Sequence, residues 1–105
     1  MRDTIKSPRL THQTLKVLHA FMERPGVGIS GSEIWKDTGM FSGTLYPILL
    51  RLEKAGWLHS HWEEVDASEV GRPRRRLYQL TNAGYKKAQS AFREIEIRPI
   101  VPLSA

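Results

Sequence analysis

The segment "SGTLYPILLRLEKAGWLHSHWEE", residues 42–64, changes its hydrophobic period in the middle and thereby decides the fold. Before Gly56 the apolar residues follow the spacing i, i+3, i+4, i+7, which places them on one face of a helix. They are Leu45, Ile48, Leu49 and Leu52. After Gly56 apolar and polar residues alternate, as in a short strand. The segment predicts a helix that starts after an N-cap at Ser42 and ends at Gly56, followed directly by a strand over residues 57–63.

A second alternating segment, "RRLYQL" at residues 75–80, predicts another short strand. Between the two strands lies a polar loop, residues 64–73, that ends in Gly71 and Pro73. Adjacent strands joined by such a loop most simply form a hairpin. The run "GRPRRR" at residues 71–76 then places its arginines at the tip of the hairpin and along the start of its second strand.

At four places along the chain, Ser or Thr residues stand at helix N-cap positions. Each has an apolar residue before it and another four positions after it, the spacing of a hydrophobic staple. They are Thr11, Ser30, Ser42 and Thr81. Ser30 is also followed by Glu33, which completes a capping box. These signals predict helices over residues 11–23, 31–38 and 82–95, the first with an inner stripe of Leu15, Leu18 and Met22.

The order of elements is helix, short helix, helix, hairpin, helix. Only Gly39, Met40 and Phe41 separate the second and third helices, and a short connection containing glycine is typical of a helix-turn-helix. The second helix of that motif enters the major groove of DNA. A hairpin directly after it makes the motif winged, and residues 28–29 can add a third strand. The predicted fold class is mainly α with a small β-hairpin wing.

Charge is concentrated in one part of the chain. The 105 residues carry a net charge of +5, and residues 70–87 hold four arginines and two lysines with no acidic residue. Such a block is typical of a surface that binds an anionic partner. No cysteine is present, and no stretch resembles a signal peptide or a membrane span. We therefore expect a soluble cytoplasmic protein that does not bind a membrane.

Catalytic and metal-binding patterns are weak. His59 and His61 point the same way from one strand, but no third ligand is positioned near them, so exposed strand residues are the better interpretation. His12 and His19 lie seven apart on the first helix, where they face solvent or a partner subunit. No Ser–His–Asp order, carboxylate pair or phosphate-binding loop stands out. The sequence predicts no enzymatic activity, no metal and no cofactor.

The segments "SGTLYPILLRLEKAGWLHSHWEE" and "GRPRRRLYQLTNAG" together resemble the PadR family of bacterial transcriptional regulators. The resemblance covers about residues 29–84, with Leu77 in place of the usual aromatic residue and Asn82 in place of the usual proline. It implies a winged helix-turn-helix that binds double-stranded DNA. One helix and a tail stand where many members have a longer C-terminal helical region, so the resemblance gives no support for a small-molecule effector.

Two groups of residues are the candidates for DNA contact. On the helix that would enter the major groove they are Ser42, Gly43, Thr44, Tyr46, Pro47 and Arg51. On the wing they are Arg72, Arg74 and Arg75. Ser42 and Tyr46 also have structural roles as cap and staple, and Arg51 can contact a phosphate or pair with a carboxylate. Trp35, Trp57 and Trp62 are most simply core or interface residues.

The last helix carries a stripe with spacings of three, four and three, the pattern of helices that pack against one another. Its residues are Tyr85, Ala88, Phe92 and Ile95. For one short helix this stripe can also cover the core of its own chain. Because the stripe spans only about two heptads and is too short to be stable alone, we favour a dimer interface. The predicted organisation is an N-terminal arm at 1–10, a winged helix-turn-helix at 11–80, a dimerisation helix at 81–96 and an extended tail at 97–105.

The expected function is sequence-specific binding of double-stranded DNA by a homodimeric transcriptional regulator that represses by covering its promoter. Two alternatives remain open from the sequence. One is a winged-helix adaptor that binds protein through the wing and the neighbouring helix. The other is a sensor in which a small aromatic compound controls DNA binding.

Overall fold

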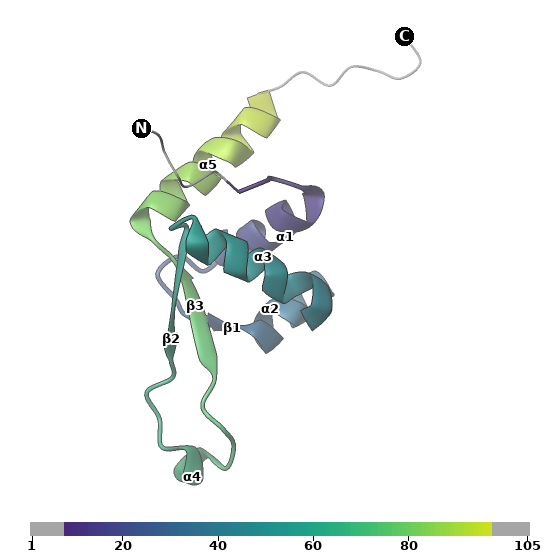
Figure 1. Ribbon diagram of the computed structural model, residues 1–105. Helices are drawn as coiled ribbons and strands as arrows, with labels where there is room; N and C mark the ends of the chain where they lie inside the picture. Colours follow the sequence, from purple (N-terminus) through teal and green to yellow (C-terminus); the bar gives the residue numbers. More distant parts are fainter. Residues whose placement is uncertain (1–7, 98–105) are drawn as a thin grey trace.

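The helices pack into one body from which a long hairpin projects (Figure 1). This computed structural model describes residues 8–97, with side chains as far as residue 95. The elements are α1 (His12–Met22), β1 (Ile29–Ser30), α2 (Gly31–Thr38), α3 (Ser42–Lys54), β2 (Leu58–Trp62), α4 (Ala67–Val70), β3 (Arg76–Leu80) and α5 (Asn82–Ile97). The mainly α class with a hairpin wing is confirmed. None of the helices in this range is long and apolar enough to cross a membrane.

The two predicted terminal segments fall mostly outside the described residues. Of the arm at 1–10, only residues 8–10 are described, and they form no helix or strand. Of the tail at 97–105, only Ile97 is described, and it is helical because α5 continues two residues beyond the predicted end. The remainder of the predicted tail, residues 98–105, lies outside the described range.

Helix α1 buries a different stripe from the predicted one. The side chains of Thr14, Val17, Leu18 and Phe21 are buried, whereas Leu15 and Met22 are only half-buried. The sequence holds two overlapping helical stripes that share Leu18. The stripe with Val17 and Phe21 faces the core, and Leu15 lies at the edge of a groove between α1 and α5.

Both predicted ends of α2 are confirmed. The Ser30 hydroxyl accepts a hydrogen bond from the Glu33 amide at 3.3 Å, and the Glu33 carboxylate accepts one from the Ser30 amide at 3.0 Å. The latter bond is the main reason that the pKa of Glu33 is lowered. Gly39 ends the helix with a φ of 73°, a left-handed conformation that glycine adopts without steric cost.

Helix α3 begins one residue earlier than expected. Phe41, not Ser42, is the N-cap, because its extended backbone places its carbonyl oxygen to accept from the amides of Thr44 and Leu45 at 3.0 and 2.9 Å. No side chain caps this end, so the prediction of a Ser42 cap is wrong. The predicted inner face is confirmed, and its four leucine and isoleucine side chains are at most 3% exposed.

The sheet has the strand order β1-β3-β2, and all its pairs are antiparallel. The β2–β3 hairpin and the small third strand were both predicted. The helix α5 packs tightly on the start of the hairpin: a side-chain carbon at Gly84 would overlap the backbone of Trp57. The Thr81 hydroxyl also donates to the Gly56 carbonyl at 2.7 Å and accepts from the Gly84 amide at 2.9 Å. These contacts fix the hairpin relative to the helical body.

The predicted irregular loop at residues 64–73 contains a short helix, α4, at the far end of the hairpin (Figure 1). The Asp66 carboxylate caps it by accepting from the Ser68 amide at 2.9 Å, and Gly71 ends it with a φ of 71°. A single helical turn has no apolar period to detect, since none of its residues is buried.

Candidate nucleic-acid interface

The outer face of α3 is exposed along its whole length. Opposite its buried face, the exposed positions are Ser42, Gly43, Tyr46, Pro47, Leu50, Arg51 and Lys54. Of the predicted contact residues on α3, only Thr44 is half-buried. Sequence reasoning missed Leu50, which is 52% exposed. Its position could have shown this, because one residue advances a helix by 100° and so separates Leu50 from the buried Leu49.

The ring of Tyr46 leans from α3 onto the first turn of α2. A side-chain carbon at Gly31 would overlap the Tyr46 hydroxyl and lie 2.9 Å from its ring carbon Cζ. Glycine at position 31 therefore makes the room that this ring occupies. Together with Trp35 and Phe41, which are 44% and 74% exposed, the ring borders an open hollow of about 320 Å³ between the starts of the two helices.

Within the wing, the side chain of Arg72 is held by the carboxylate of Glu63. The guanidinium donates twice to Glu63, at 2.7 and 3.0 Å, and the Arg75 amide donates to the same carboxylate at 3.2 Å. Hydrogen bonding from Arg72 is the main reason that the pKa of Glu63 falls to about 2, and it also raises the pKa of Arg72. Such a bidentate pair fixes the position of the guanidinium at the base of the wing loop.

The other two wing arginines are exposed. Arg74 donates from Nε to the carbonyl of Val65 at 2.9 Å, which ties its side chain across the loop and leaves its terminal nitrogens for a further partner. Arg75 is exposed beside it. The predicted wing residues therefore divide into one arginine held by a carboxylate and two that present charge to solvent.

Arg76 lies where the paired strands of the hairpin meet the wing loop, opposite Trp62. It lies over the ring of Trp62 at 5.1 Å from the centroid and donates to the Ser60 hydroxyl at 3.0 Å. Trp62 itself is 57% exposed, whereas Trp57 is buried in the core. Of the three tryptophans predicted as core or interface residues, one is thus a core residue and the other two, Trp35 and Trp62, lie at the surface.

His59 and His61 lie side by side on β2, with ring centroids 6.0 Å apart. Among the described residues no group of three or more histidine, cysteine or acidic side chains is placed to hold a metal ion. The pair remains two exposed rings on a strand.

The stripe of α5 is used partly within the chain. Ala88 is fully buried, and Tyr85 and Phe92 pack half-buried on the same core, whereas Ile95 is 51% exposed. The contact predicted for Ala88 with a partner is thus made inside the chain, because this part of α5 covers the helical body.

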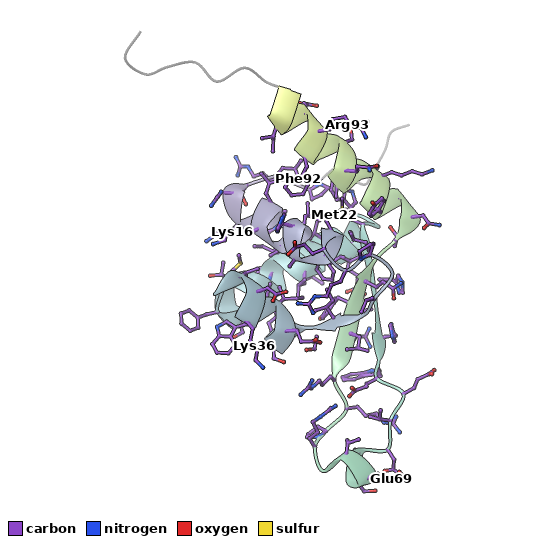
Figure 2. All side chains as sticks on the ribbon, turned by 180° about the vertical axis from the view of Figure 1, so that it is seen from behind. Lys16, Met22, Lys36, Glu69, Phe92 and Arg93 are labelled. Carbon is purple, nitrogen blue, oxygen red and sulfur yellow. The ribbon has the colours of Figure 1, made fainter. Side chains whose placement is uncertain are left out.

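Toward its C-terminal end, α5 forms one wall of an open groove of about 450 Å³ whose other wall is α1. Phe92 points from α5 toward α1 (Figure 2), and its ring meets that of His19 edge-on at 6.2 Å. His12 and Ile95 also line this groove. Both α1 histidines, which were predicted to face solvent or a partner subunit, therefore line this groove.

Solved structures of bacterial and archaeal proteins share this fold. AbfR of Staphylococcus epidermidis is 23% identical with a TM-score of 0.69, over 86% of this chain and 56% of its own. The S. aureus MepR–DNA complex is 21% identical with a TM-score of 0.65, over 84% and 68%. AF1382 from Archaeoglobus fulgidus is 19% identical with a TM-score of 0.67, over 84% and 89%. The chain therefore spans little more than half the length of AbfR.

No curated protein sequence matches the chain significantly. The model of one family does, and it covers residues 17–90, which include α2, α3, the complete wing and the first half of α5. This confirms the resemblance carried by the two motifs at residues 42–64 and 71–84. The chain belongs to the transcriptional regulator PadR-like family.

Proposed function

We propose that this protein binds double-stranded DNA sequence-specifically and acts as a homodimeric transcriptional repressor. The observation that supports this most directly is the exposed outer face of α3, which stands at the position of the major-groove helix in a winged helix-turn-helix. The exposed arginines of the wing add the positive charge that phosphates attract. Among the similar structures, MepR is bound to DNA, and AbfR has also been solved bound to DNA.

In this proposal α3 lies in the major groove while Arg74 and Arg75 reach the flanking phosphates. A dimer places two copies of α3 on half-sites about 34 Å apart, one turn of the duplex. The bound dimer represses by covering promoter DNA and catalyses no reaction. Because its target is chromosomal DNA, the protein acts in the cytoplasm.

The test of DNA binding is selection of duplexes from a random library by the full chain, followed by affinity measurements at several salt concentrations. We expect enrichment of a two-fold symmetric site that is bound at least a thousandfold more tightly than random DNA. Enrichment of no sequence, with equal binding to all duplexes, would contradict sequence-specific recognition. A winged-helix adaptor would show neither enrichment nor a steep dependence on salt.

The dimer part of the proposal rests on the groove between α1 and α5. Ile95 is exposed at its edge although it is apolar, and a two-fold related copy would cover it. Ile95→Asp should dissociate the dimer without disturbing the core. Gln89→Asp, another exposed change on α5, is the control and should leave the dimer intact. Sedimentation equilibrium should give twice the chain mass of 12.0 kDa for the wild type and the control. A wild-type mass of one chain would contradict the dimer.

A further inference from the structure

The centre of the outer face of α3 is apolar. Its outward positions Gly43, Pro47 and Leu50 carry no hydrogen-bonding side chain, and the aromatic rings of Tyr46 and Phe41 continue the same surface toward the start of the helix. Leu50 and Phe41 are 52% and 74% exposed. A helix that reads bases only by hydrogen bonds would place polar side chains at these positions.

Three features of this surface run against local structural preference. Phe41 occupies an N-cap position without capping, although Ser, Thr, Asp and Asn are favoured there. Pro47 lies inside α3, where it removes a backbone hydrogen bond. Gly31 stands in α2, where alanine is the better helix former, and its lack of a side chain seats the Tyr46 ring. Such conflicts are expected where a surface serves function.

The charges around this surface suit an anionic partner such as DNA rather than a basic or neutral protein. Arg51 and Lys54 flank it on α3. The single carboxylate of α3, Glu53, accepts from the Ser60 hydroxyl at 2.6 Å at the base of the hairpin. On α2 both Glu33 and Asp37 pair with Arg24. An apolar strip bordered by cations fits a groove that is lined by phosphates.

The major groove offers one apolar group, the 5-methyl of thymine. We propose that α3 recognises thymine through this methyl group, with Leu50 as the main contact and Phe41 as a second contact nearer the start of the helix. This inference rests on the proposed DNA-binding function and names its chemistry. The preferred site is then rich in thymine at the bases facing α3, and hydrogen bonds contribute less to the choice of sequence than methyl contacts do.

The test replaces each thymine of the selected site in turn by deoxyuridine, which lacks only the 5-methyl group. Binding is measured for the wild type, Leu50→Ala, Phe41→Ala and Lys54→Ala. Loss of one buried methyl should weaken wild-type binding about fourfold at each contacted thymine. In Leu50→Ala, the loss of affinity caused by deoxyuridine at one contacted thymine should fall below about twofold. In Phe41→Ala, the same should hold at a different thymine. Lys54→Ala is the control on the same helix. It should weaken binding equally to the duplex with thymine and to the duplex with deoxyuridine.

Three outcomes overturn the inference. In the first, deoxyuridine is tolerated at every position of a site that the wild type selects, so the proposed function holds and methyl reading fails. In the second, the penalty persists unchanged in both Leu50→Ala and Phe41→Ala. In the third, Leu50→Ala binds the selected site as tightly as the wild type, as expected if the face docks a protein. Enrichment of no sequence at all overturns the proposed function together with the inference.

Discussion

The outer face of α3 and the wing differ in chemical character, although both are proposed to contact the same partner. On α3 the central side chains are apolar, and the chain accepts an uncapped helix start and an internal proline to present them. On the wing the side chains are arginines, and two of the three predicted contact residues are tied down by hydrogen bonds within the hairpin. Arg72 is held by Glu63 and Arg74 by the carbonyl of Val65.

In the proposed complex, this difference would separate sequence specificity from overall affinity. Charge on a fixed hairpin attracts phosphates regardless of sequence, and because its side chains are already ordered, less entropy is lost on binding. Apolar groups on α3 gain little from phosphates and discriminate only among base edges. The two regions should therefore respond differently to salt, to sequence and to substitution.

The largest effect is expected from the wing. Replacing Arg74 and Arg75 together by Ala should lower affinity for all duplexes on the order of tenfold or more, and should flatten the slope of log affinity against log salt by about 0.9 for each lost phosphate contact. The preference for the selected site over random DNA should not change. Arg93→Ala, an exposed change on α5, is the control (Figure 2). An unchanged salt slope in the double variant would remove the wing from the interface.

The support of Tyr46 by Gly31 should appear as a change in stability. Gly31→Ala forces the new carbon against the end of the Tyr46 side chain. Because that ring is 46% exposed and can turn away, the fold should lose only about 1 kcal/mol or less. Adding Tyr46→Phe removes the hydroxyl and should recover part of that loss. Gly43→Ala is the matched control, since open space surrounds that glycine. Thermal denaturation gives the comparison, and equal stability of the two alanine variants would contradict the close contact.

Phe41→Ser should separate stability from recognition. Serine can cap α3, so the variant should be more stable than the wild type by about 1 kcal/mol in urea denaturation. The same variant should bind the selected site less tightly, because the exposed ring is lost. Phe41→Ala should show the weaker binding without the gain in stability. Tight binding by both variants would show that the ring has no part in recognition.

The smallest effect concerns the ion pair of the wing. The pKa of Glu63 in the folded protein is about 2, below its ordinary value of 4.5. The stabilisation that its carboxylate gives to the folded state is therefore complete above about pH 4.5 and is lost as the pH falls toward 2. A carbon-detected NMR titration should give a midpoint near 2 for this carboxyl, and Arg72→Ala should raise the midpoint. A wild-type midpoint near 4.5 would contradict the pairing of Glu63 with Arg72.

The sequence predicted those elements whose ends carry local signals. The capping box of Ser30 and the stop at Gly39 define α2, and the i, i+3, i+4, i+7 spacing of Leu45, Ile48, Leu49 and Leu52 defines the inner face of α3. In α1, by contrast, two apolar stripes overlap, and only packing selects the one with Val17 and Phe21. Helix α4 has no buried residue and therefore no apolar period, so its sequence signals are only the cap at Asp66 and the stop at Gly71.

The site was predicted less completely. Leu50 and Phe41 are missing from the predicted contacts because the exposure of an apolar side chain depends on how α2 and α3 pack. Arg72 was grouped with the other wing arginines because its partner, Glu63, lies nine residues earlier and meets it only across the folded hairpin. Pairings of this kind depend on tertiary structure.

The most direct test of this division compares Leu50→Ala with the Arg74→Ala, Arg75→Ala double variant on the selected site and on random DNA, at several salt concentrations. Leu50→Ala should reduce the ratio of the two affinities and leave the salt slope at its wild-type value. The wing variant should flatten the slope and leave the ratio unchanged. If Leu50→Ala instead flattens the slope, or if the wing variant abolishes the preference for the selected site, specificity and affinity are not divided between α3 and the wing.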